Sequence, residues 1–149
     1  MGVPTKGTIV TKSISNLTPK QFEEMVYDIL DAERFENLTW REGGGDSGRD
    51  IEATTFERDA SGYQDKFIWF CDAKLYARGV PFEKIQPALS PATATKPHYL
   101  LFAVYPHLTP QCKDLLDEWK SKNNPSFRVR LWEKKDIWKR LRRHPEVIR

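Results

Sequence analysis

The sequence predicts an α/β domain in which a mixed central β-sheet is flanked by helices. Three observations support this prediction. The chain has 149 residues, the size of one domain. Segments rich in aromatic and β-branched residues alternate along it with segments of helical apolar periodicity. Two of the apolar segments, 66–76 and 98–105, have long apolar runs, as central strands covered on both faces do. The coarse element order is α-β-β-α-β-α-β-α.

The N-terminal third of the chain is predicted to contain one well-defined helix. Thr18 can cap this helix, and Pro19 suits its first position. Apolar residues recur at spacings of three and four and form one face, and Glu23 lies beside that face. The expected elements are a loose lead-in or short edge strand over 1–17, a helix over 19–32, a short strand over 38–42, a Gly-rich turn over 43–48 and a strand over 49–56.

The rest of the chain alternates strands and helices. The strand over 66–76 has the strongest pattern, and Pro87 and Pro91 are expected to shorten or kink the helix that follows it. The expected elements are a hairpin loop over 59–65, a strand over 66–76, a helix over 81–94, a strand over 98–105, a helix over 110–122, a strand over 126–132 and a basic amphipathic helix over 133–143.

Composition excludes several classes of protein. No apolar run approaches the roughly 20 residues that span a bilayer, and the N-terminus lacks the apolar core of a secretory signal. We therefore expect a cytoplasmic protein without a membrane partner. Cys71 and Cys112 form no metal-binding pair and are expected to be free thiols. Residues 126–149 hold nine Lys and Arg against three acidic residues, which indicates either a polyanion partner or a solvated helix face.

Three residues indicate a catalytic site. Asp72 and Lys74 are two positions apart on a predicted strand, so they share a face of the sheet. Asp50 begins the preceding strand, and an antiparallel pairing brings it close to them if the register allows. Oxygen donors of this kind suit Mg²⁺ or Mn²⁺, and an adjacent lysine can stabilise charge developing on a phosphate. Asp72 also interrupts the most apolar strand of the chain, where a charge must be paired or metal-bound.

The sequence resembles the PD-(D/E)xK nuclease superfamily, in particular its Mrr-like restriction endonuclease domains. The resemblance covers roughly 18–143 and implies a restriction-endonuclease-like three-layer fold, with the nuclease domain over 18–149. Its motifs are the helical Phe22-Glu23 pair, the Gly-rich turn 44–49 that leads to Asp50, the Asp72-Ala73-Lys74 triplet, and the strand 98–105 followed by Leu108-Thr109-Pro110 and a helix. Asp72 stands where many such domains have Gln or Glu, and Arg49 stands where the superfamily label has proline.

The resemblance also implies residue roles. Asp50 and Asp72 would bind Mg²⁺ or Mn²⁺, with the backbone carbonyl of Ala73 as a third ligand. Lys74 would be the catalytic lysine. Glu23 would reach the site from the first helix, through a metal-bound water or as a second-metal ligand; Glu24 replaces it if the helix is rotated by one residue. Gln86 is a further candidate for contacting water or a backbone phosphate.

The function expected on these grounds is a metal-dependent endonuclease that hydrolyses DNA phosphodiester bonds. By resemblance it would be an effector domain of a prokaryotic restriction or anti-phage defence protein, acting as a homo-oligomer or fused to a sensor or recognition domain. Two alternatives stay open: a non-catalytic nuclease-like module that binds nucleic acid or a partner, and a related resolvase or RNase. The basic residues expected to contact phosphates, or else to dock a neighbouring domain, are Arg128, Arg130, Lys134, Lys135, Lys139, Arg140, Arg142 and Arg143.

Overall fold

The sheet is mixed, as the sequence predicts. The structure is a computed structural model that describes residues 14–41 and 50–147. Five strands lie in the order β1-β2-β3-β4-β5. Strand β2 runs antiparallel to its neighbours β1 and β3, and β4 and β5 run parallel to β3. The strands are β1 (Glu36–Trp40), β2 (Ile51–Arg58), β3 (Gln64–Leu75), β4 (Tyr99–Tyr105) and β5 (Arg128–Trp132).

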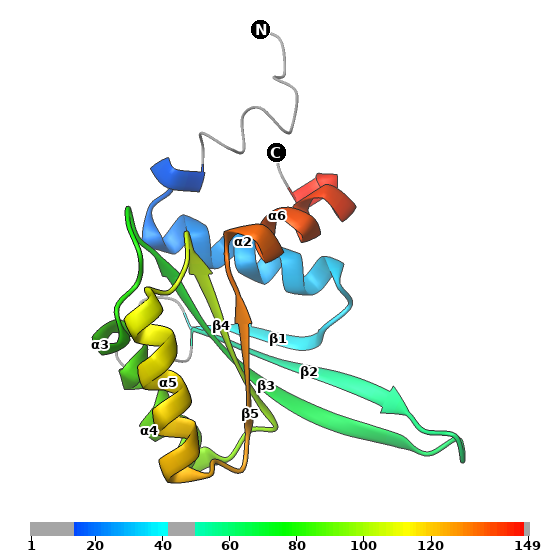
Figure 1. Cartoon of the computed structure of the whole chain (residues 1–149). Helices are drawn as coiled ribbons and strands as arrows, with labels where there is room; N and C mark the ends of the chain where they lie inside the picture. The colour runs from blue at the N-terminus through cyan, green and yellow to red at the C-terminus, as the bar shows by residue number, and fades with distance from the viewer. Residues whose placement is uncertain (1–13, 42–49, 148–149) are drawn as a thin grey trace, which may run out of the picture.

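Helices cover both faces of the sheet and give three layers (Figure 1). One face packs against η1 (Ile14–Asn16), α2 (Pro19–Ala32), α6 (Lys134–Arg143) and η3 (Pro145–Val147). The other face packs against α3 (Phe82–Ile85), η2 (Gln86–Ala88), α4 (Leu89–Thr95) and α5 (Pro110–Asn123). Each face has its own apolar cluster, so the central strand β4 is buried along its whole length. The predicted fold class is therefore confirmed.

Helix α2 has the bounds that its sequence predicts. The Thr18 hydroxyl accepts a hydrogen bond from the Gln21 amide at 3.1 Å, and the Gln21 side chain accepts one from the Thr18 amide at 2.9 Å. This reciprocal capping box satisfies two backbone donors at the start of the helix. Ile14, which precedes the cap, is buried in the same apolar cluster as α2. The packed structure therefore includes part of the segment 1–17, of which residues 1–13 lie outside the described residues.

The helix expected over 81–94 and the strand expected over 38–42 differ from the structure. The helix expected over 81–94 consists of three pieces, because Pro87 has no amide hydrogen to donate and the chain forms a 3₁₀ turn there. The strand expected over 38–42 corresponds to β1, which begins two residues earlier, and the coarse element order has no place for this strand. The pairing of β1 with β2 is irregular between Glu36 and Thr39. None of the described helices is long and apolar enough to cross a membrane.

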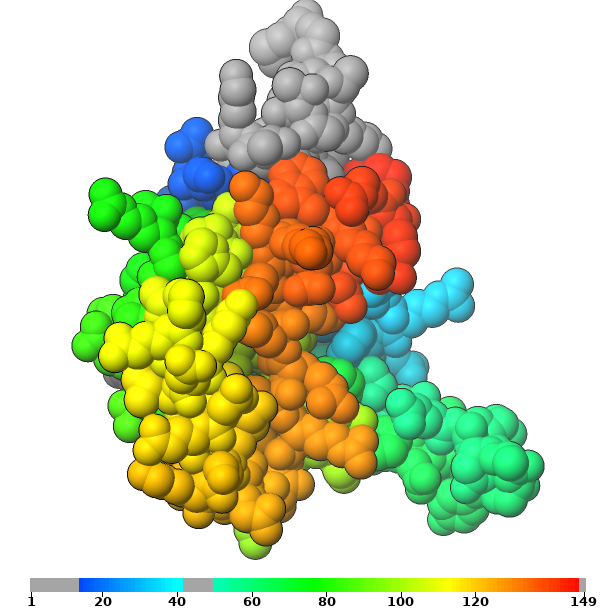
Figure 2. All heavy atoms as spheres, viewed as in Figure 1, coloured from blue at the N-terminus to red at the C-terminus, as the bar shows by residue number. Residues whose placement is uncertain are grey.

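The β2–β3 hairpin projects from the body of the molecule (Figure 2). Its turn is shorter than the predicted loop 59–65, because β3 already begins at Gln64. The Asp59 carboxylate accepts hydrogen bonds from the amides of Ser61 and Tyr63, which closes the turn. The other end of this hairpin, where β2 begins and β3 ends, lies beneath α2 and carries the predicted site residues.

Candidate active site

The β2–β3 pairing places Asp50 beside Asp72. Ile51 pairs with Cys71 in the antiparallel ladder. Asp50, which directly precedes β2, therefore lies opposite Asp72 of β3. The Asp50 amide donates to the Cys71 carbonyl at 2.9 Å, and the Ala73 amide donates to Asp50 Oδ2 at 2.8 Å. The Asp50 carboxylate is therefore fixed against the backbone of the Asp72-Ala73-Lys74 triplet, in the register that the sequence argument required.

Asp72 is fully buried and ion-paired with Lys74. Its Oδ1 lies 3.0 Å from Lys74 Nζ. Apart from this ion pair, neither carboxylate oxygen has a hydrogen-bond partner within 14–41 and 50–147. Burial raises the pKa of Asp72 to about 7; Lys74 opposes the rise, and the neighbouring Asp50 adds to it. A buried carboxylate with unsatisfied oxygens is costly to the fold and available to a cation.

Lys74 carries a positive charge at the site. Burial alone would lower its pKa, but the charge and hydrogen bond of Asp72, together with the charge of Asp50, raise the pKa above its ordinary value. The side chain keeps 21% of its surface exposed, whereas that of Asp72 keeps 1%. The ammonium group is therefore charged at neutral pH and lies between the buried carboxylate and solvent.

Glu23 reaches the same place from helix α2. It lines a pocket of about 250 Å³ together with Pro19, Asp50, Ala73, Lys74, Leu75 and Tyr76. Trp40 Nε1 donates to Glu23 Oε1 at 3.1 Å. Burial raises the pKa of Glu23 above its ordinary value, although the hydrogen bond from Trp40 acts in the opposite direction. Glu24 lines a different cavity, beside Asp28 and Asp31, so the helix presents Glu23 to the pocket.

The donor chemistry of the site fits a hard divalent cation. The carboxylates of Asp50 and Asp72 and the carbonyl of Ala73 offer oxygen ligands, and Asp72 has oxygens with no hydrogen bond from the described chain. The described residues contain no group of three or more His, Cys, Asp or Glu side chains arranged to hold a metal. Mg²⁺ commonly takes only one or two carboxylates, with water and substrate phosphate completing its octahedron. The two aspartates are sufficient for that mode of binding.

A comparison with protein-family models identifies the family. The model Mrr_cat, described as "Restriction endonuclease", matches residues 14–141. The chain belongs to the Mrr_cat restriction endonuclease family. The matched range contains Glu23, Asp50, Asp72 and Lys74. No curated protein sequence matches.

Two solved structures share the fold of this Mrr_cat domain. The "DNA modification-dependent restriction endonuclease AspBHI" is 17% identical, with a TM-score of 0.63 over 99% of this chain and 38% of that chain. The "MspJI Restriction Endonuclease in Complex with 27-mer Oligonucleotide" is 13% identical, with a TM-score of 0.57 over 93% of this chain and 29% of that chain. The Mrr_cat chain thus spans well under half the length of these two proteins.

The other predicted residues are either absent from the described lining of the pocket or lie outside the described residues. Gln86 is exposed on η2 and is not among the described residues that line the pocket. The Gly-rich turn 43–48 and Arg49 lie outside the described residues. Arg128 and Arg130 are exposed on the edge strand β5, and Arg130 lies over the Tyr99 ring at 5.2 Å. The remaining basic candidates, Lys134, Lys135, Lys139, Arg140, Arg142 and Arg143, lie on α6.

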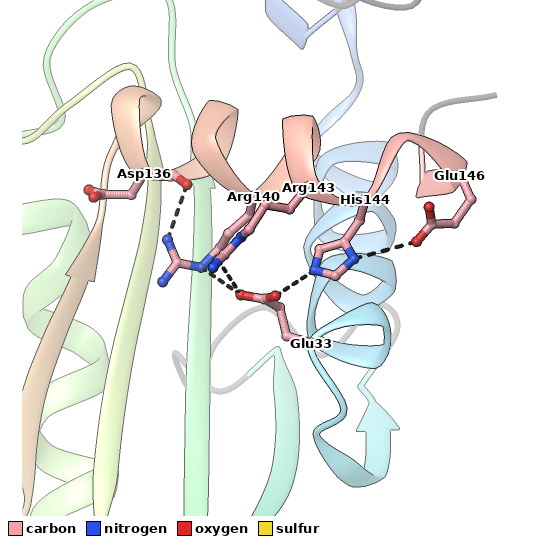
Figure 3. Close-up of polar contacts among 6 residues, drawn as sticks. All are labelled: Glu33, Asp136, Arg140, Arg143, His144 and Glu146. Atoms are coloured by element: carbon pink, nitrogen blue, oxygen red, sulfur yellow. Dashed lines mark hydrogen bonds and ion pairs between the residues drawn. The ribbon is translucent and has the colours of Figure 1, made fainter.

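Two of the α6 arginines belong to an ion-pair cluster around Glu33 (Figure 3). Arg143 Nη2 lies 2.8 Å and Arg140 Nε 3.3 Å from Glu33 Oε1. His144 Nε2 lies 2.5 Å from Glu33 Oε2, and its Nδ1 lies 3.5 Å from Glu146. This cluster, which we call the Glu33 cluster, ties the C-terminal end of α6 to the end of α2. Sequence reasoning missed it because its members are more than a hundred positions apart.

Trp40 is the other residue that sequence reasoning missed. It contacts the Tyr27 ring and donates to Glu23, 17 positions earlier in the chain. A tryptophan within a predicted strand is most simply explained as a core residue, and nothing in its local pattern shows that it donates a hydrogen bond to a carboxylate. Only the pairing of β1 with β2 beneath α2 brings it to the site.

Proposed function

We propose that this chain is the catalytic domain of a metal-dependent endonuclease that hydrolyses DNA phosphodiester bonds. One observation carries the proposal: Asp50 is fixed beside the buried Asp72, Asp72 is ion-paired with Lys74, and Glu23 lines the same pocket as Asp50 and Lys74. Membership of a restriction endonuclease family supports the reaction class. The arrangement offers a cation site, a fixed positive charge and an additional carboxylate within one small pocket.

Each residue has a distinct role in the proposed reaction. Asp50 and Asp72 would hold Mg²⁺ or Mn²⁺, with the Ala73 carbonyl as a third ligand. When bound, such an ion polarises the phosphodiester and lowers the pKa of a coordinated water. Lys74 would stabilise the negative charge that develops on the phosphate oxygens and orient the attacking water. Glu23 would accept a hydrogen bond from that water or bind a second ion.

DNA is the proposed substrate, and the basic surfaces of β5 and α6 are the proposed nucleic-acid contacts. MspJI, which shares the fold, was solved in complex with a 27-mer oligonucleotide. Because this chain spans 38% or less of the two solved enzymes, we propose that it acts with a fused recognition or sensor domain or as a homo-oligomer. Family membership is also the basis for proposing a role in prokaryotic restriction or anti-phage defence.

Cleavage of supercoiled plasmid in Mg²⁺ or Mn²⁺ tests the proposal. The wild-type protein should cut in either metal and not in EDTA, and Asp72→Ala should abolish cutting. Asp65→Ala is the matched control, because Asp65 is an exposed aspartate at the far end of the same strand. An Asp72→Ala protein that cuts as well as wild type contradicts the assigned site. A ribonucleotide or four-way-junction substrate that is cut in preference to plasmid would indicate an RNase or a resolvase.

Metal binding is measured independently of activity. A ligand at one hundred times its Kd stabilises the folded state by about 2.7 kcal/mol, which raises the melting temperature. Mg²⁺ or Mn²⁺ should therefore raise the melting temperature of wild type and of Asp65→Ala, but not of Asp72→Ala. A wild-type protein that binds DNA, is not stabilised by metal and does not cut would be a non-catalytic module.

A further inference from the structure

A second groove lies at the same ends of the strands as the candidate catalytic pocket. It has a volume of about 420 Å³ and is lined by Pro106 and His107 from the turn after β4 and by Lys134, Trp138 and Arg142 from α6. Strands β3, β4 and β5 are parallel, so their carboxyl ends all point the same way, towards the end of the sheet where α6 begins (Figure 1). The catalytic pocket lies at the end of β3, and the groove lies at the ends of β4 and β5.

Helix α6 divides its basic residues between two flanks. Lys134, Trp138 and Arg142 are four positions apart and therefore share one face of the helix, and all three line the groove. Arg140 and Arg143 instead join the Glu33 cluster on the other flank (Figure 3). The basic residues that line the groove are thus different from Arg140 and Arg143, which hold α6 against α2.

The positive charge of the groove is not balanced by nearby carboxylates. No carboxylate among the described residues is ion-paired with Lys134, Lys135 or Arg142. Glu133 also lines the groove, but its Oε2 accepts from the Leu108 amide at 2.8 Å and its Oε1 lies 3.2 Å from Lys113 Nζ. Three cations therefore surround a groove whose one lining carboxylate in the described chain is already engaged.

The groove is close to the catalytic pocket. Lys134 Nζ lies 5.8 Å from the centre of the Tyr105 ring, Tyr105 pairs with Leu75 across β3 and β4, and Leu75 lines the pocket. Two strand spacings separate β3 from β5, about 10 Å. A strand of duplex DNA places one phosphate about every 3.4 Å along its axis. A backbone with one phosphodiester in the pocket therefore has other phosphates within reach of the groove.

We propose that this groove binds the phosphate backbone of the DNA a few nucleotides from the bond that is cut, with Lys134, Lys135 and Arg142 as its contacts. The proposal rests on the proposed nuclease function and assigns it a second anchoring point for the substrate. Contacts to phosphates carry no sequence information, so the groove sets the position of the duplex and not the recognition site. Arg140 and Arg143 are excluded from this role, because they hold α6 to Glu33.

The test measures binding of a fluorescently labelled DNA duplex in EDTA, where no cleavage occurs, across a series of sodium chloride concentrations. The variant Lys134→Gln/Lys135→Gln is compared with Lys66→Gln/Lys96→Gln, two exposed lysines near the start of β3 and just before β4, at the opposite ends of these strands. The groove variant should reduce the slope of log affinity against log salt by about 2, one for each lost phosphate contact. The control pair should leave the slope unchanged, and Lys134→Arg/Lys135→Arg should restore it.

Circular dichroism confirms that each variant is folded before binding is interpreted. Equal salt slopes for wild type and the groove variant overturn the proposal, as does an equal loss in the control pair. The assay needs neither metal nor turnover. A protein that loses binding with the groove variant but never cuts DNA would contradict the nuclease function and not the groove. A protein that cuts DNA but binds equally well with the groove variant would contradict the groove alone.

Discussion

The Trp40 indole donates a hydrogen bond to the Glu23 carboxylate at 3.1 Å, and this bond joins the first strand of the sheet to the helix above it. Glu23 lines the pocket and accepts this hydrogen bond, so in the proposed site Trp40 would act through another residue. Partners that orient a ligand in this way commonly contribute about 10–100-fold to metal affinity or activity.

Trp40→Phe removes the donor and keeps an aromatic ring against Tyr27. We expect the Mg²⁺ concentration that gives half-maximal cleavage to rise by about ten-fold, because Glu23 loses the bond that fixes it. Trp119→Phe, on the other side of the sheet, is the matched control. A metal requirement that is unchanged in Trp40→Phe, with the fold intact, would show that this bond does not position Glu23.

Asp72 should make the metal-free protein less stable as the pH rises. Its pKa is about 7 in the folded protein and near 3.8 when unfolded, so the folded state binds the proton more tightly. The stability that protonation provides is present below about pH 4 and is lost as the pH rises through about 7. The raised pKa of Lys74 acts only at pH values above that range.

Asp72→Asn removes this titration. We expect the melting temperature of the variant, relative to wild type, to increase between about pH 5 and pH 8, by the equivalent of at most a few kcal/mol. The measurement is thermal unfolding in EDTA at both pH values, with Asp65→Asn as control. A difference between variant and wild type that stays constant with pH would contradict the assigned burial and charge of Asp72.

Glu33 should matter for stability although it lies away from the pocket. Glu33→Gln leaves Arg140, Arg143 and His144 without their shared carboxylate, and we expect a loss of about 1–2 kcal/mol in the free energy of unfolding. Glu118→Gln breaks an exposed ion pair with Lys122 and should cost clearly less, because solvent screens that pair. Urea denaturation measures both. Equal losses would mean that the Glu33 cluster is no more than a surface ion pair.

Local chemistry made much of the fold predictable. The bounds of α2 follow from Thr18, Pro19 and the apolar period, and the charged Asp72 within an apolar strand indicated the candidate site. What could not be predicted depends on distant contacts. The Glu33 cluster and the Trp40–Glu23 bond join elements whose pairing is decided by the whole sheet. The helix predicted over 81–94 was expected to be shortened or kinked by its prolines, but the sequence did not show that Pro87 would divide it into three pieces.

The central claim is that Lys74 and the two aspartates form one hydrolytic site, and the rate of a single turnover tests it most directly. Supercoiled plasmid is mixed with excess protein and Mg²⁺, and the rate of Lys74→Ala is compared with that of Lys66→Ala, a lysine exposed on the same strand. Removing a group that stabilises the transition state typically costs about 10²–10³-fold. We predict a loss of that size for Lys74→Ala and none for Lys66→Ala. Equal rates for the two variants would contradict the account.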